Sequence, residues 1–309
     1  MIITVTLNAS VDKTAFINNF QIGKINRFDK PIELAGGKGL NVTRTLKILG
    51  HAPVATGFLG GKTGEKLEIL MDDEGIIHNF QKIKDKSRSC LAIIDNKLNT
   101  LTELNENGPD ITDDELNEFY TKLSVINPEA KIVIISGSIP KNLPKTIYYD
   151  LINICKERGL LTVLDATGEE LKKGIEAKPF IIKPNKIEAE ELLGFRLDSK
   201  NSLIKGLKHL CNYCNIACIT LEDKGCVISN NEESFYLIPP QINLINSVGS
   251  GDAFMAGLVH ALTQNESIKE MGKWGISCGS ANAMTDRAGF CNIKDVMSIL
   301  TDIEVRPLR

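Results

Sequence analysis

One stretch near residue 250 combines glycines, a carboxylate and the start of a helix. Its sequence is Asn-Ser-Val-Gly-Ser-Gly-Asp over residues 246–252, and apolar side chains then recur at helical spacing from residue 253 to residue 262. The backbone N–H groups of Gly249, Ser250 and Gly251, with the positive end of the helix dipole behind them, predict an anion-binding site. Asp252 could accept a proton from an attacking hydroxyl, as in phosphoryl transfer. We expect the helix start to lower the pKa of Asp252. The alternative is an ordinary βα turn that Asp252 caps.

A second glycine cluster surrounds Lys38, in the sequence Gly-Gly-Lys-Gly over residues 36–39. A helix start already supplies positive charge, so a lysine there indicates an anionic substrate, above all a phosphate. Asp12 and Asn41 are suited to holding hydroxyl groups, although a turn and a first helical turn use the same residue types. Arg88 could reach the same anion, or it could be a solvated surface residue.

Two segments imitate a Walker phosphate loop without satisfying its pattern. Residues 57–63 end in Gly-Lys-Thr, but Thr56 occupies the position that requires glycine, and residues 36–39 have glycine where the metal-binding Ser or Thr belongs. No G-x-G-x-x-G segment opens a helix after the first strand. The sequence therefore disfavours a P-loop NTPase and a dinucleotide-binding domain.

A third group of polar residues begins at Lys183, in the sequence Lys-Pro-Asn-x-x-Glu that ends at Glu188. Asn185 and Glu188 have the spacing of a capping box. They could instead organise water and Mg²⁺ near nucleotide phosphates, because Mg²⁺ keeps much of its water and takes few protein carboxylates. Thr220 and Gly225 could line a triphosphate, with an ordinary hairpin as the alternative.

Alternating strands and helices must position these groups. We predict a strand over 2–8 and, further along the chain, strands over 131–136, 160–164, 180–182, 216–221 and 226–229, with helices over 113–125, 144–158, 186–193, 200–214, 251–263, 267–285 and 292–300. This order predicts an α/β fold in one domain over 1–309: a doubly wound, mostly parallel sheet with helices on both faces. Ligands bind at the carboxyl ends of such strands, where Asn8, Ser136, Asp165, Lys183 and Thr220 lie. Short alternating runs within about 13–35 and 88–105 predict a separate small sheet.

The composition excludes several other classes of protein. With 309 residues and a net charge of −3, the chain gives no electrostatic case for binding nucleic acid or an anionic membrane. No signal peptide or membrane-spanning run is evident, and the eight scattered cysteines indicate free thiols in a reducing cytoplasm. Cys211, Cys214 and Cys218 have a metal-like spacing, but we interpret them as buried thiols.

The two glycine signatures together resemble those of the ribokinase/PfkB carbohydrate kinase family, over essentially the whole chain. Further motifs are similar to its hexose-phosphate branch, which includes 1-phosphofructokinase and tagatose-6-phosphate kinase. They are Thr-Leu-Asn-x-Ser-x-Asp ending at Asp12, Asn-Val-Thr-Arg over 41–44, Thr-Glu-Leu-Asn over 102–105, Ser-Gly-Ser-Ile-Pro over 136–140, Leu-Asp-x-x-Gly over 164–168 and Ile-Lys-Pro-Asn over 182–185. The resemblance implies ATP-dependent phosphorylation of a ketohexose monophosphate to the bisphosphate, with Mg²⁺, under a β-sheet lid that often dimerises.

The resemblance also implies roles for individual residues. Asp252 would be the base beside the 249–251 turn; the substrate would meet Asp12, Gly37, Lys38, Asn41, Arg88 and Ser136; ATP would meet Lys183, Asn185, Glu188, Thr220, Gly225 and Asn282, with Glu188 reaching the metal through water. Arg27 is a candidate for reaching a partner subunit's site. Ala9 and Glu222 depart from the family pattern, as do Ser89 and Cys90 beside Arg88.

The choice of hexose phosphate stays open at this point. So do a ribokinase-like kinase of an unphosphorylated sugar or nucleoside, and a non-catalytic sugar-phosphate sensor.

Overall fold

The computed structural model describes residues 1–98, 100–125 and 127–308. Eleven strands form the main sheet in the order β15-β14-β13-β12-β11-β10-β9-β1-β4-β5, with β6 also paired to β4. Their bounds are β1 Ile2–Thr6, β4 Val54–Gly60, β5 Ile77–His78, β6 Gln81–Ile83, β9 Ile132–Ser136, β10 Leu161–Asp165, β11 Ile181–Ile182, β12 Ile216–Thr220, β13 Cys226–Ser229, β14 Ser234–Ile238 and β15 Glu304–Pro307.

Strands β1, β4, β5, β6 and β9 to β12 pair in parallel, whereas β13, β14 and β15 are antiparallel additions at one edge. Strand β1 lies between β4 and β9, so the chain winds to one side of β1 and then to the other. The carboxyl end of β1 is therefore the switch point at which a ligand crevice opens.

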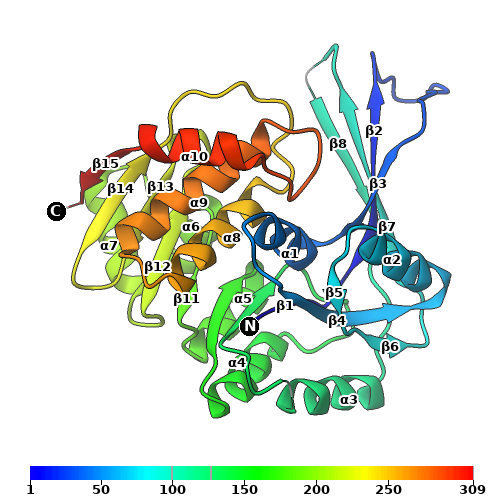
Figure 1. Cartoon of the computed structure of the whole chain (residues 1–309), viewed down its shortest axis with the longest axis horizontal. Helices are drawn as coiled ribbons and strands as arrows, with labels where there is room; N and C mark the ends of the chain where they lie inside the picture. Colours follow the sequence, from blue (N-terminus) through cyan, green and yellow to red (C-terminus); the bar gives the residue numbers. More distant parts are fainter. Residues whose placement is uncertain (99, 126, 309) are drawn as a thin grey trace.

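Helices cover both faces of this sheet (Figure 1). Side chains of β1 that alternate along the strand enter two different core clusters: Ile3 and Val5 pack with the α3–α7 side, while Ile2 packs with α1, α8, α9 and α10. The helices are α1 Lys38–Ile48, α2 Gly61–Asp73, α3 Asp113–Ser124, α4 Ile147–Glu157, α5 Gly168–Glu176, α6 Lys186–Leu193, α7 Lys200–Leu210, α8 Ser250–Thr263, α9 Ile268–Ala283 and α10 Ile293–Asp302, with a 3₁₀ turn η1 Glu222–Lys224.

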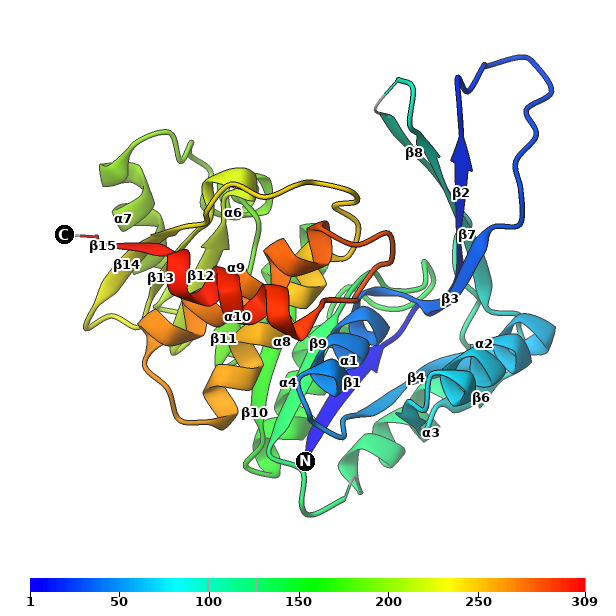
Figure 2. The ribbon, with the colours of Figure 1, turned by 45° about the horizontal axis from the view of Figure 1, so that its top comes forward.

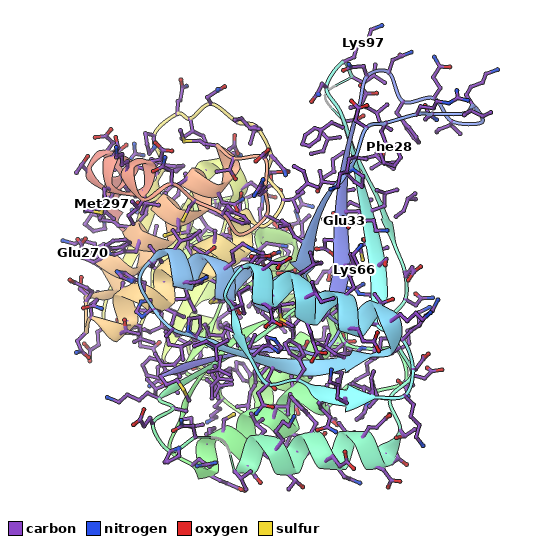
Figure 3. All side chains as sticks on the ribbon, turned by 45° about the vertical axis from the view of Figure 1, so that its right-hand side comes forward. Phe28, Glu33, Lys66, Lys97, Glu270 and Met297 are labelled. Carbon is purple, nitrogen blue, oxygen red and sulfur yellow. The ribbon has the colours of Figure 1, made fainter. Side chains whose placement is uncertain are left out.

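A separate four-stranded sheet, which we call the lid, stands away from the core (Figure 2). Its order is β3 Ile32–Gly36, β2 Ser10–Ile17, β7 Arg88–Asp95 and β8 Thr100–Asn105. At its base, Glu33 of β3 accepts a hydrogen bond from Lys66 of α2 at 2.6 Å (Figure 3). The predicted fold class, a doubly wound α/β core with a small β-sheet lid, is thus confirmed.

Some elements were not foreseen from the sequence. Helix α5 was missed because it begins at Gly168 and contains Gly174, and glycine is a poor helix former. Strands β14 and β15 were missed as well; β15 is a polar edge strand that contains Pro307. The predicted helix over 200–214 ends earlier, at Leu210. No strand forms at Phe20–Ile22, because the chain turns at Asn19 with φ 67°.

Close backbone contact explains one glycine of the second cluster. A Cβ atom at Gly39 would lie 2.3 Å from Oγ1 of Thr6 and 2.8 Å from the carbonyl oxygen of Val5. Helix α1 can therefore start against the end of β1 only if residue 39 has no side chain. This packing places Lys38 at the switch point.

Candidate active site

A cavity of about 510 Å³ opens where the end of β1, the start of α1, the lid and the turn before α8 meet. Its walls include all six residues predicted to bind the substrate, namely Asp12, Gly37, Lys38, Asn41, Arg88 and Ser136, together with Gly249 and Asp252. Ser250, Gly251 and the six residues predicted near ATP are not part of its lining. The structure thus brings the two glycine signatures to one cavity.

Helix α8 presents Asp252 to this cavity. Gly249 precedes the helix in a left-handed conformation, with φ 80°, and a Cβ there would lie 2.8 Å from the backbone nitrogen of Gly289. Asp252 is only 6% exposed, and its Oδ2 accepts a hydrogen bond from Nδ2 of Asn41 at 2.9 Å. The carboxylate is therefore held in place by a residue from the other signature.

The expectation that the helix start lowers the pKa of Asp252 is wrong. Burial raises this pKa to about 6; Lys38, Asn41 and Lys183 act to lower it, and Asp165 raises it further. Burial is therefore the main cause of the shift in the pKa of Asp252. A carboxylate with a pKa near 6 is a better proton acceptor than an ordinary aspartate and is still ionised at neutral pH.

Asp165, at the end of β10, links two lysines. Its side chain is 1% exposed, and its oxygens lie 3.5 Å from Nζ of Lys38 and 3.3 Å from Nζ of Lys183. Burial alone would raise the pKa of Asp165, but Lys183 and Lys38 hold it below its ordinary value. Asp165 in turn is the main cause of the raised pKa of Lys38, to which Asp252 and Glu188 also contribute. Lys38 is therefore a permanent cation.

Asp12 and Arg88 lie on adjacent lid strands. Oγ of Ser10 donates to Oδ1 of Asp12 at 2.5 Å, and the carboxyl group fills the space that a Gly36 side chain would occupy. Burial raises the pKa of Asp12, against the lowering effects of Ser10 and Arg88. Nε of Arg88 donates to the carbonyl oxygen of Asn8 at 3.1 Å, so its guanidinium lies at the junction of lid and core.

Polar residues predicted near the nucleotide have structural partners. Asn185 and Glu188 form the capping box of α6, with backbone N–H bonds to their side chains of 2.9 and 2.8 Å. The backbone of Thr220 lies beside Asn185, through a parallel bridge. Gly225 has φ 93° and would place a Cβ 2.0 Å from the carbonyl oxygen of Leu237, so the hairpin itself requires glycine.

Asn282 of α9 is fully buried behind the turn that precedes α8. Its Nδ2 donates to the carbonyl oxygen of Val248 at 2.9 Å and to Oγ of Ser250 at 3.1 Å, and its Oδ1 accepts from the backbone of Gly289 at 2.7 Å. In this structure Asn282 fixes the shape of the turn.

Other features seen in the sequence do not converge on a site. Cys211, Cys214 and Cys218 are buried free thiols, and no group of three or more metal-binding side chains occurs among the described residues. Arg27 is exposed in the loop between β2 and β3 and is not part of the cavity lining. Within the described ranges, no helix combines the length and apolar character needed to cross a bilayer.

Two further groups stood in family-like motifs of the sequence but were given no role at the site. Asp165 was placed at a strand end and in the Leu-Asp-x-x-Gly motif; its signal was a carboxylate there with lysines at the ends of neighbouring elements. Glu103 and Asn105 of β8 also line the cavity, because Asn105 pairs with Cys90, which in turn pairs with Asp12. Only the lid register reveals that these residues share a face.

A doubly wound core, a β-sheet lid and a buried aspartate at a glycine turn define an α/β sugar phosphotransferase. The model for pfkB family carbohydrate kinases matches residues 6–295. A tagatose-6-phosphate kinase from Staphylococcus epidermidis is 34% identical over 309 residues, 99% of each chain, and a 1-phosphofructokinase from Bacillus subtilis is 33% identical over all of both chains. The chain belongs to the pfkB family of carbohydrate kinases and is an ATP-dependent sugar kinase.

A solved structure supports the same conclusion. The crystal structure of phosphofructokinase-2 from Escherichia coli in complex with fructose-6-phosphate matches with a TM-score of 0.91 and 25% sequence identity, over 97% of this chain and 98% of that chain. The likeness extends over the core and the lid together.

Proposed function

We propose that the protein transfers the γ-phosphoryl group of ATP to the free primary hydroxyl of a ketohexose monophosphate, which yields the bisphosphate and ADP. The observation that carries this proposal is the shared cavity. Lys38 and Asp252 belong to signatures about two hundred residues apart in the sequence, yet both line this cavity. The names of the relatives, a tagatose-6-phosphate kinase and a 1-phosphofructokinase, support a phosphorylated acceptor.

The residues of the sugar half have distinct roles in this proposal. Lys38 and Arg88 hold the phosphate of the acceptor; the third cation of the cavity wall, Lys13, is paired with Glu33. Asp12 and Asn41 orient hydroxyl groups, with Gly37 and Ser136 close to the sugar. Asp252 accepts the proton of the attacking hydroxyl, and the oxygen then bonds to phosphorus as the bond to ADP breaks.

The nucleotide half offers a fit for phosphates. Gly251 is exposed, and a Cβ there would meet only Nζ of Lys183, at 3.9 Å, so a phosphate can approach the backbone closely with a cation beside it. ATP supplies the phosphoryl group, and Mg²⁺ neutralises charge on its phosphates. We assign nucleotide contacts to Lys183, Asn185, Thr220, Gly225 and Asn282. Glu188 would hold the metal through water.

Replacing Asp252 by Asn tests the proton acceptor. We expect kcat to fall about 10²- to 10⁴-fold, the usual contribution of a general base. ATP should still bind. Turnover within a few fold of the wild type would refute the assignment.

The same variant carries its own folding control. Because the pKa of Asp252 rises from 3.8 to about 6 on folding, the folded protein binds the proton more tightly, and stability falls as pH rises through this window. Asparagine removes that penalty, which corresponds to roughly 3 kcal/mol. Asp252→Asn should therefore unfold at a higher temperature than the wild type at neutral pH, and a melting curve that shows this excludes unfolding as the cause of its inactivity.

Two rival functions are separated by one assay. A coupled ADP-release assay over fructose 1-phosphate, fructose 6-phosphate, tagatose 6-phosphate and free sugars identifies the acceptor. Preference for a free sugar or a nucleoside would favour a ribokinase-like kinase. Ligand binding without ADP release would favour a sugar-phosphate sensor.

We also propose a homodimer through the lid and a cytoplasmic location. Phe16 and Leu101 of the lid are 36% and 45% exposed, and Phe28 of the β2–β3 loop is 45% exposed (Figure 3). A second copy would cover this apolar surface and bring Arg27 to the interface. The eight free thiols fit a reducing compartment. Sedimentation of Phe28→Asp against the wild type tests the dimer.

A further inference from the structure

Arg44 of α1 is a buried cation that touches neither the cavity nor the surface. It is 3% exposed, and such a charge is tolerated only when its donors are satisfied. Its Nε and Nη2 both donate to the carboxylate of Glu74, just after α2. Nη2 also donates to the carbonyl oxygen of Ala35 at 2.8 Å, and Nη1 to that of Ala288 at 3.2 Å.

One further hydrogen bond of Arg44 leads to the proton acceptor. Nη1 donates to Oδ1 of Asn41 at 3.0 Å, and Nδ2 of the same amide donates to Asp252 at 2.9 Å. An amide turned the other way would set its NH₂ group against the guanidinium and its oxygen against the carboxylate, so two attractions would become two repulsions. Arg44 therefore decides which atom of Asn41 faces Asp252.

We propose that Arg44 is a positioning residue for phosphoryl transfer, which locks the Asn41 amide so that an N–H group always points at the Asp252 carboxylate. This inference rests on the proposed function, since it takes Asp252 as the proton acceptor. Arg44 would act through Asn41 and would not touch the substrate.

Activity against pH is the readout that distinguishes this role from a structural one. The charged groups that face Asp252 are Lys38 of α1, Asp165 of β10 and Lys183, which directly follows β11, and none of them hydrogen-bonds to Arg44 among the described contacts. The Asn41 bond favours the ionised form of Asp252, so losing it raises the pKa of Asp252 above about 6. The acid limb of kcat, which needs ionised Asp252, then moves to higher pH.

The experiment is a double-mutant cycle of Arg44→Lys and Asn41→Ala, with kcat measured against pH at saturating ATP and sugar phosphate. Lysine keeps a charge for Glu74 but lacks the planar fork that reaches Asn41 as well. We expect each single variant to shift the acid limb upward by about one pH unit, the worth of a hydrogen bond to a charged group. The double variant should shift it no further than Asn41→Ala alone, because both changes remove the same bond.

Arg306→Lys is the matched control, because Arg306 also binds a glutamate, Glu304, at an exposed edge strand far from the cavity. Its acid limb should stay in place. An unmoved acid limb in Arg44→Lys, or additive shifts in the double variant, would overturn the proposal.

Two further variants separate a failure of this proposal from misfolding and from a failure of the proposed function. If Arg44→Lys does not fold, the pair Arg44→Met and Glu74→Met removes both charges together, and the same shift is expected from it. Asp252→Asn tests the proton acceptor separately, so a failure of the proposed function is not confused with a failure of this one.

Discussion

The two halves of the proposed active site, the sugar half and the nucleotide half, use polar atoms in opposite ways. In the sugar half, Oγ1 of Thr6, Oδ1 of Asn8 and Oγ of Ser136 are buried without a hydrogen-bond partner in the described part of the chain. In the nucleotide half, the side chains already have partners. Asn185 and Glu188 form the capping box of α6, and Asn282 hydrogen-bonds to the backbone of Val248 and Gly289. Unpaired buried polar atoms are rare in folded proteins, and those at the wall of the cavity are free to bind a ligand or water.

This difference indicates that the sugar half is the half whose polar side chains are preorganised to bind a ligand. The sugar half keeps polar atoms and charges in place at a cost in stability, which only a bound polar molecule can offset. The nucleotide half offers mainly backbone groups and helix ends to a ligand. Its polar side chains stabilise the fold whether or not a ligand is present. Substitutions in the two halves should therefore separate activity from stability in different ways.

Among the substitutions that compare the two halves, Lys38→Ala in the sugar half should have the largest effect. Loss of a charged hydrogen bond to a phosphate should lower kcat/KM about 100-fold for a sugar phosphate. The KM for a free sugar should change much less, since that acceptor has no phosphate to hold. Lys62→Ala, an exposed lysine of the other Gly-Lys-Thr segment, is the control in the same steady-state assay. Equal changes for both acceptors would favour the kinase of an unphosphorylated sugar.

Ser136→Ala should have two smaller effects: a gain in stability and a loss of affinity for the acceptor. Removing an unpaired buried hydroxyl should raise the free energy of unfolding by about 1 kcal/mol, while the KM for the acceptor rises about fivefold. Urea denaturation and initial rates measure the two quantities. A variant that is less stable than the wild type would show that this hydroxyl already has a partner in the free protein.

The smallest effect is expected from Asn185→Ala in the nucleotide half. Loss of the cap of α6 should lower the free energy of unfolding by about 1 kcal/mol and the melting temperature by about 2 °C. Ser199→Ala removes the equivalent capping box of α7 and is the matched control. If only Asn185→Ala also raises the KM for ATP, Asn185 has a second role; if neither does, its role is the cap alone.

The sequence predicted the elements with strong periodicity and both glycine turns. Alternating strands and helices were enough for the doubly wound core, whereas α5 contains two glycines and β15 has too few apolar positions for a pattern. Lys38 and Asp252 followed from local residue types. Their meeting at one cavity required the fold.

The electrostatics of the site could not be predicted from neighbouring residues. The pKa of Asp252 depends on burial beneath α1 and on Lys38, Asp165 and Lys183, which are remote in sequence. A local argument from the helix dipole gave the wrong sign. The proposed role of Arg44 was hidden for the same reason, since Glu74 and Ala288 are remote from it in sequence and Asn41 meets Asp252 only in the folded chain.

The tight contact of Gly39 with β1 has a practical consequence for protein engineering. In a library that varies the whole Gly-Gly-Lys-Gly segment, most variants would fail to fold, because a Cβ atom at residue 39 would lie 2.8 Å from the carbonyl oxygen of Val5. Cys90 and Ala92 line the lid wall of the cavity with small side chains. Directed evolution of acceptor choice should start from those two positions and leave the glycine untouched.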